Sequence, residues 1–357
     1  MSSMGASLVL GLAATAATYL GVGRFCRWAE HRQMLDVPNE RSSHTRPTPR
    51  GGGLVIAAVT LLGAATIASV VPSLWSVFLP YAAGAVLVAV VSWFEDLHSI
   101  PRSVRFAAHL LGAHAAILGL GYWRTISLPF LGAVSLGRWG IAVTALWIVG
   151  LTNAYNFMDG TDGIAASQAL VAGIGWALLG CTAGQPLVSG IGLLIAACSL
   201  GFLGHNWPPA RIFMGDVGSA FLGYTLAILP LMYGFFDRKG TGAPAVGLLL
   251  VWPFVFDAAF TFVRRFLRRE NVFAPHRSHL YQRMTSAHSG HALVALIYAG
   301  LAAAGGALAQ VWSTRVADGA VSGVLALPAL FLGLWAFAVA REHRLACSTG
   351  AQCIHKS

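Results

Sequence analysis

Amide and carboxylate side chains recur at regular spacing in one short stretch of an otherwise apolar chain. Asn153, Asn156 and Asp159 follow one another at intervals of three residues, and Asp162 follows after three more. If the preceding helix continues through this stretch, the two amides and the first carboxylate share one of its faces. A polar turn in which Asp162 caps the next helix is the alternative. Four such groups in a hydrophobic chain favour a binding site for a charged ligand.

Further acids stand at the ends of apolar runs or inside them. Asp216 lies between two glycines at the start of a run, where backbone N–H groups can bind phosphate and a carboxylate can hold Mg²⁺. A simple helix cap is the alternative for this residue. Glu95 and Asp96 end an earlier run, and the repulsion between adjacent carboxylates favours a bound cation. Asp257 lies inside a long run, where a buried acid is a functional candidate by default.

Two basic patches complement these acids. His276, Arg277 and His279 lie close together in one polar loop. The histidines could bind zinc, but no further Cys or His stands at a convincing ligand spacing, and Arg suits an oxyanion such as phosphate better. Arg50 precedes three glycines, a pattern that indicates an anion cradle, with an ordinary polar loop as the alternative.

The elements that position these groups follow from composition. The chain of 357 residues is 56% hydrophobic and only 10% charged, with a mean hydropathy of +0.68, which excludes a water-soluble fold. A bilayer core about 30 Å thick needs about 20 apolar residues per helix. We therefore predict an all-α polytopic membrane protein with about eleven spans, near 4–23, 51–70, 74–94, 104–120, 138–156, 163–182, 186–204, 217–236, 243–263, 292–312 and 319–340. No internal repeat or linker is evident, so we predict a single transmembrane catalytic domain over 1–345 and a short cytoplasmic tail over 346–357.

The distribution of charge predicts the orientation. The 23 Lys and Arg against 13 acids could suggest a nucleic-acid-binding protein, but in a membrane protein such an excess marks cytoplasmic loops. With the N-terminus outside and the C-terminus in the cytoplasm, 18 of these bases fall on the inner side and 5 on the outer side. Most acids fall on the inner side too, and because acids contribute little to topology, their gathering there indicates a site.

Five of these motifs, taken together, resemble the polyprenyl-phosphate N-acetylhexosamine-1-phosphate transferases, glycosyltransferase family 4. They are Asn-Glu-Arg-Ser-Ser-His…Pro-Thr-Pro-Arg-Gly-Gly, the acid pair, Asn-x-x-Asn-x-x-Asp-Gly-x-Asp-Gly, Phe-Met-Gly-Asp-x-Gly-Ser and His-Arg-Ser-His, in that order between residues 36 and 283. The resemblance implies ten or eleven helices and a cytoplasmic active site. It departs at Glu95, since the family usually has Asp-Asp at the acid pair.

The resemblance also implies residue roles. Asp216 would hold Mg²⁺ or Mn²⁺, and Phe213 would stack on uracil. The nucleotide and the metal would be lined by Asn153, Asn156, Asp159 and Asp162. One acid of the pair Glu95 and Asp96 would deprotonate the lipid phosphate, and the sugar-nucleotide pyrophosphate would contact His276, Arg277 and His279.

The implied partners are a UDP-N-acetylhexosamine, undecaprenyl phosphate and membrane lipid, with no nucleic acid; a homodimer is compatible with the sequence. The resemblance implies a multi-pass protein of the bacterial inner membrane. The Arg-Ser-Ser-His and Trp-Pro-Pro-Ala-Arg stretches are more similar to the branch that initiates O-antigen and surface polysaccharide, in lipopolysaccharide biosynthesis, than to the peptidoglycan branch.

Two other functions compete with this interpretation. An ion-coupled secondary transporter could use Asp257 and the Asn/Asp stripe, but transporter sites lie near the membrane midplane in repeated halves. A CDP-alcohol phosphotransferase is the second, but its Asp-Gly-x-x-Ala-Arg signature fails because Ser167 stands where the arginine is required. Both alternatives predict no release of UMP from a UDP-sugar and a lipid phosphate.

Overall fold

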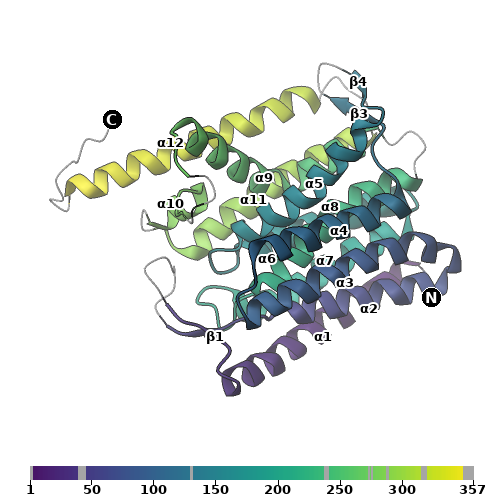
Figure 1. Cartoon of the computed structure of the whole chain (residues 1–357), viewed down its shortest axis with the longest axis horizontal. Helices are drawn as coiled ribbons and strands as arrows, with labels where there is room; N and C mark the ends of the chain where they lie inside the picture. Colours follow the sequence, from purple (N-terminus) through teal and green to yellow (C-terminus); the bar gives the residue numbers. More distant parts are fainter. Residues whose placement is uncertain are drawn as a thin grey trace.

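The computed structural model is a bundle of helices whose chain repeatedly crosses between two ends (Figure 1). It describes residues 3–38, 46–128, 132–236, 241–271, 274, 276–286, 289–314 and 320–348. The helices are α1 (Ser3–His31), α2 (Gly53–Val70), α3 (Trp75–Leu97), α4 (Arg102–Leu120), α5 (Trp139–Met158), α6 (Ile164–Thr182), α7 (Pro186–Asn206), α8 (Gly215–Phe236), α9 (Ala243–Leu267), α10 (Leu280–Ser286), α11 (His291–Thr314) and α12 (Ala320–Ser348), with a 3₁₀ turn at Pro72–Leu74.

Ten helices in the described part of the chain are long and apolar enough to cross a membrane. They correspond to the first ten predicted spans, so the all-α polytopic fold is confirmed. The eleventh predicted span, 319–340, falls on α12, which is not among the ten, and residue 319 lies outside the described residues. Because α12 continues to Ser348, helical structure runs past the predicted start of the tail at 346, while 349–357 lie outside the described residues. The domain boundary and the orientation of the termini stay predictions.

Helix α8 forms the centre of the bundle, between α2, α3, α5 and α9 (Figure 1). Its residues from Val217 to Met232 are all buried, as expected of a helix that is apolar on every side. Small residues let neighbouring helices approach it closely, because helices in lipid associate through van der Waals packing rather than through a hydrophobic drive. This central helix also begins at the acid that the sequence singles out, Asp216.

Two short hairpins lie at opposite ends of the bundle (Figure 1). Strands β1 (Leu35–Asp36) and β2 (Thr48–Pro49) pair at the end where α1 finishes. Strands β3 (Thr125–Leu128) and β4 (Gly132–Ser135) pair at the other end, with Thr125 opposite Ser135. The C-termini of α3 and α5 and the N-termini of α4 and α8 all lie at the β1 end. The loops that follow α3 and α5 and the loop that precedes α8 therefore meet on one side of the bundle, the side that the charges assign to the cytoplasm.

Candidate active site

The first turn of α8 is held by an acid from another helix. Asp96, at the end of α3, is only 3% exposed. Its Oδ1 accepts a hydrogen bond from the backbone N–H of Asp216 at 3.0 Å, and its Oδ2 accepts one from the N–H of Val217 at 3.0 Å. These N–H groups have no partner within the helix, and the positive end of the helix dipole favours a carboxylate there. Asp96 therefore fixes the position from which the Asp216 side chain projects.

Close backbone contacts fix the same turn from the side of α2. The N–H of Gly52 donates to the carbonyl of Phe213 at 3.1 Å, and the N–H of Gly53 donates to that of Met214 at 2.8 Å. A Cβ on Gly53 would stand 2.2 Å from the Cα of Gly218, so only glycine permits this approach. The predicted anion cradle after Arg50 is therefore wrong for these two glycines, because their N–H groups are already used. The Arg50 side chain is partly buried beside this turn.

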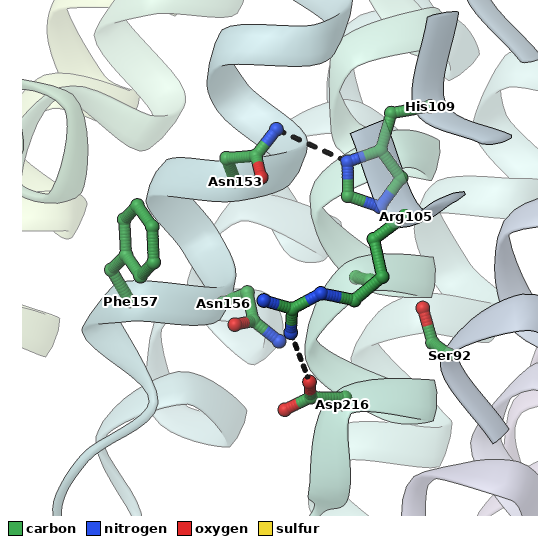
Figure 2. Close-up of a pocket in the computed structure, with 8 residues that line it drawn as sticks. Ser92, Arg105, His109, Asn153, Asn156, Phe157 and Asp216 are labelled. Atoms are coloured by element: carbon green, nitrogen blue, oxygen red, sulfur yellow. Dashed lines mark hydrogen bonds and ion pairs between the residues drawn. The ribbon is translucent and has the colours of Figure 1, made fainter. Parts of the chain in front are cut away.

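A pocket opens where α3, α4, α5 and α8 meet (Figure 2). Its lining brings together three of the predicted site residues, namely Asn153, Asn156 and Asp216. The Nδ2 of Asn156 donates to the Ser219 hydroxyl at 3.0 Å, which ties α5 to α8. The remaining lining residues are Ser92, Arg105, His109, Phe157 and Ala220. The pocket thus combines a carboxylate, amides, a guanidinium and an imidazole, which suits a polar, charged ligand.

Arg105, on α4, is a site residue that the sequence interpretation missed. Its Nη1 lies 2.9 Å from Oδ2 of Asp216 and 3.5 Å from Oε1 of Glu95. The other carboxylate oxygen of Glu95, Oε2, accepts the N–H of Ile100 at 2.8 Å. In the sequence Arg105 is one of many basic residues near helix ends, so it contributes only to the orientation. The structure shows instead that its guanidinium connects two acids from separate helices.

The carboxylates after α5 raise the negative charge of the same region. Burial, followed by the neighbouring carboxylates of Asp216, Asp96 and Asp162, raises the pKa of Asp159 to about 8. Oδ2 of Asp162 accepts the N–H of Ala210 at 3.1 Å and lies 3.3 Å from Nδ1 of a histidine at the start of α11. Gly163 rather than Asp162 is the N-cap residue of α6, and the N–H of Gly163 donates to the side chain of Asn206 at 2.9 Å. Asp162 instead joins the loop after α7 to α11.

Asp257 organises a second cluster, at the junction of α9 and α10. The side chain has no exposed surface. Oδ1 accepts the N–H of Leu280 at 3.0 Å, and Oδ2 accepts the hydroxyl of Tyr298 at 2.6 Å. His279 places its Nδ1 at 3.4 Å from Oδ1. Because Asp257 offers no surface to a substrate, we assign it to holding the loop rather than to the substrate contact that was predicted.

The histidine loop held by Asp257 approaches the end of α5. Nδ1 of His276 lies 2.9 Å from the Ser278 hydroxyl, and burial, followed by the neighbouring His279 and Arg265, lowers the pKa of His276 to about 4. Arg277 is exposed. In the next turn, the Tyr281 hydroxyl donates to the carbonyl of Phe157 at 3.0 Å.

Through Tyr281 this segment contacts Phe157, which lines the pocket of Figure 2. The predicted residues His276, Arg277 and His279 do not line the pocket themselves. Phe213, which is partly buried just before α8, does not line the pocket either.

Comparison with known proteins places this site in a family. The model of glycosyl transferase family 4 matches residues 78–234, which include the acid pair, the Asn/Asp stripe and Asp216. The probable undecaprenyl-phosphate N-acetylglucosaminyl 1-phosphate transferase of Bacillus subtilis is 31% identical over 265 residues, covering 74% of this chain and 73% of that protein. The chain belongs to the polyprenyl-phosphate hexosamine-1-phosphate transferase family.

This transferase is also similar to two other groups of proteins. The decaprenyl-phosphate N-acetylglucosaminephosphotransferase of Mycobacterium tuberculosis is 29% identical over 349 residues, covering 90% of this chain and 83% of that protein. The phospho-N-acetylmuramoyl-pentapeptide-transferase of Lactiplantibacillus plantarum is 28% identical over 242 residues, covering 64% of this chain and 75% of that protein. The chain is thus a multi-pass membrane phosphoglycosyltransferase, whose partners are a polyprenyl phosphate, a nucleotide sugar and membrane lipid.

The carboxylate and amide oxygens at the transferase's site would suit a hard divalent cation better than zinc. In the described part of the chain, no three His, Cys, Asp or Glu side chains stand close enough to form a metal cluster. Zinc needs three or four protein ligands. Mg²⁺ is commonly bound by one or two carboxylates with water and substrate phosphates. Burial, followed by the carboxylates gathered around it, raises the pKa of Asp159, and this concentration of acids near Asp216 suits such a cation.

Proposed function

We propose that the protein transfers an N-acetylhexosamine 1-phosphate from a UDP-sugar to undecaprenyl phosphate, releasing UMP and forming undecaprenyl-diphosphate-sugar. The observation that carries this proposal is the meeting of Asn153, Asn156, Arg105 and Asp216 in one pocket at the ends of membrane helices. The N-acetylglucosamine 1-phosphate transferases among its relatives support an N-acetylglucosamine donor and a polyprenyl phosphate acceptor. Transport is disfavoured, since these groups gather at one end of the bundle rather than at its middle.

Within this reaction the chain's residues bind and orient two anions. The guanidinium of Arg105 and the N-terminal end of α8 supply positive potential beside the pocket, which offsets repulsion between the two phosphate groups. The amides of Asn153 and Asn156 orient polar ligand groups. We propose Asp216 and Asp159 as ligands of Mg²⁺ or Mn²⁺, an ion that contributes positive charge at the transferring phosphate when bound.

We propose in-line attack of the lipid phosphate oxygen on the β-phosphorus of the donor. The new P–O bond forms as the bond to the UMP oxygen breaks, and UMP leaves with that electron pair. A covalent aspartyl-phosphate intermediate is the competing route. Trapping of phosphorylated enzyme with donor alone would establish the covalent route and exclude direct transfer.

The proposed setting is the bacterial inner membrane, with the pocket on the cytoplasmic face. That placement is supported by the excess of Lys and Arg in the loops at the pocket end. We further propose that the reaction is the first membrane step of surface polysaccharide assembly, such as O-antigen. This role rests on the resemblance of the sequence motifs.

The test is a donor panel with purified protein, undecaprenyl phosphate and Mg²⁺, scored by UMP release. We expect release with at least one UDP-N-acetylhexosamine. Asp216→Ala should lower the rate about 100-fold or more, since it removes a charged group from the pocket. Glu30→Ala, at an exposed acid on α1, is the matched control and should keep the wild-type rate. Absence of UMP with every donor would refute the proposed reaction, and full activity of Asp216→Ala would refute the role assigned to Asp216.

A further inference from the structure

His109 is a buried imidazole in the pocket that none of the sequence motifs includes. It lies on α4 one turn after Arg105, is 5% exposed and lines the pocket with Asn153 and Asp216. Nδ1 of His109 lies 3.1 Å from Nδ2 of Asn153 (Figure 2). A histidine in such a position needs an explanation, because a buried polar side chain is normally held for structural or binding reasons.

The hydrogen bonds of Asn153 determine which nitrogen of His109 carries the proton. The same Nδ2 of Asn153 lies 2.7 Å from the carbonyl oxygen of Val149. A carbonyl only accepts, so the atom facing it must be the amide nitrogen, with one hydrogen directed at Val149. The second hydrogen is then directed at Nδ1 of His109, which must accept. The imidazole is therefore neutral, and its proton is on Nε2.

The protonated nitrogen of His109, Nε2, is available to donate a hydrogen bond to a ligand. No hydrogen-bond partner of His109 Nε2 occurs among the residues that the structure describes, and Figure 2 shows this nitrogen on the side of the ring toward Arg105. An imidazolium is disfavoured here, since the positive charge of Arg105 is adjacent and a second N–H would face the amide of Asn153. His109 thus presents one neutral N–H donor, in a fixed orientation, beside a guanidinium.

We propose that Nε2–H of His109 donates a hydrogen bond to a phosphoryl oxygen of a substrate in this pocket. This inference rests on the proposed function for the identity of the ligand. A phosphoryl oxygen fits because it only accepts, carries negative charge beside Arg105, and forms a stronger bond with an N–H than a neutral acceptor does. The oxygen belongs either to the lipid phosphate or to the diphosphate of the nucleotide sugar. Asn153 acts as a positioning residue, since it fixes the tautomer of His109.

Two substitutions at this position separate ligand binding from a structural role. His109→Asn places an amide oxygen near the position of Nδ1, so it keeps an acceptor for Asn153 but loses the donor at Nε2. His109→Gln places its amide near Nε2, so it keeps a donor for the ligand but loses the contact with Asn153. His114→Asn, at an exposed histidine on the same helix, is the matched control.

The readout is equilibrium binding of UDP and of undecaprenyl phosphate to the full chain in detergent, together with the KM for each substrate. Uridine, which has no phosphate, is the comparison ligand. We expect His109→Asn to weaken binding of one phosphate probe about 10- to 100-fold, the loss typical of one hydrogen bond to a charged group. His109→Gln should bind that probe several-fold more tightly than His109→Asn, and uridine binding should be unchanged. The probe that responds identifies which phosphate His109 contacts.

Several results would overturn the assignment. These are wild-type binding by His109→Asn, weaker binding by His109→Gln than by His109→Asn, equal loss in both variants, or a parallel loss of uridine affinity. Failure of the proposed function is distinguishable: wild-type protein would then bind the phosphate probes without releasing UMP from any donor. Conversely, UMP release by the wild type with unchanged phosphate affinity in His109→Asn would refute only the role of His109.

Discussion

Replacing Asp96 by Asn tests whether this acid holds α8 or acts on a substrate. Both carboxylate oxygens accept backbone N–H groups of the first turn of α8, at 3.0 Å each. Asn keeps one acceptor oxygen and turns an NH₂ group toward the second N–H. One of the two hydrogen bonds is therefore lost, and one of the N–H groups of Asp216 and Val217 is left without a partner. The negative charge that the N-terminal end of the helix favours is also removed.

The expected cost follows from these contacts. Removing a helix N-cap costs about 0.5–2 kcal/mol, and leaving a buried N–H unpaired costs about 1–3 kcal/mol. Both energy ranges refer to the same lost hydrogen bond and are not added, so we expect a loss of about 2 kcal/mol in the free energy of unfolding. That loss should lower the Tm by a few degrees. Because the first turn of α8 carries Asp216, activity should fall as well, through displacement of that side chain.

The assay measures Tm and the steady-state rate of UMP release for Asp96→Asn beside Glu95→Gln. Glu95 is partly exposed, and Gln can still accept the N–H of Ile100. We therefore expect its Tm to fall by less than half as much as that of Asp96→Asn. If Asp96→Asn melts within about 1 °C of the wild type while its kcat collapses, Asp96 acts as the predicted base. That result would show that Asp96 is not needed to hold the first turn of α8.

Two further predictions concern the packing and the loops around the pocket. Gly53→Ala should destabilise the protein strongly, since its Cβ would stand 2.2 Å from the Cα of Gly218. Gly150→Ala is the control in α5, where a Cβ meets nothing within 4 Å, and it should leave the stability unchanged or raise it by up to about 1 kcal/mol. Comparison of the Tm values of the two variants checks both expectations. Tyr281→Phe removes the hydrogen bond to the Phe157 carbonyl and should cost about 0.5–1.5 kcal/mol with a raised KM, and an unchanged KM would show that this contact does not position the pocket.

The sequence predicts the membrane spans well because their signal is local. Each of the first ten runs is about as long as the bilayer is thick, and no long-range contact is needed to recognise it. The Asn153 and Asn156 stripe is equally local, since the helical period alone puts both amides on one face. The final helix is harder to predict, because α12 runs on to Ser348, beyond the apolar part of its sequence.

The contacts that complete the site depend on residues far apart in the chain. Arg105 reaches Asp216 across 111 positions, and no pattern around either residue specifies the other. His109 stands in an apolar run, where a buried core histidine is the ordinary interpretation. Its relation to Asn153 appears only once α4 and α5 are packed together. Sequence motifs therefore mark which segments form the site, while the pairing of their side chains requires the three-dimensional fold.

Two acids that the sequence presents as site residues perform the same structural task. Asp96 accepts the N–H groups of residues 216 and 217 at the start of α8, and Asp257 accepts those of residues 280 and 281 at the start of α10. In each case a carboxylate on one membrane helix, at the end of α3 or within α9, holds the beginning of a later helix. Helix α8 carries Asp216, and helix α10 follows the histidine loop.

Loss of activity alone therefore does not distinguish a ligand-binding acid from a capping acid in this protein. A capping acid stabilises the fold whether or not substrate is present, because its partners are backbone N–H groups of the chain itself. A pocket acid such as Asp216 is partly exposed and pairs with Arg105 at 2.9 Å, and such ion pairs contribute only about 0–1 kcal/mol, so neutralising Asp216 should lower Tm less than Asp96→Asn does, while turnover is lost. The size of the stability change, measured without substrate and compared with the loss of turnover, is thus the physical criterion that separates the two classes.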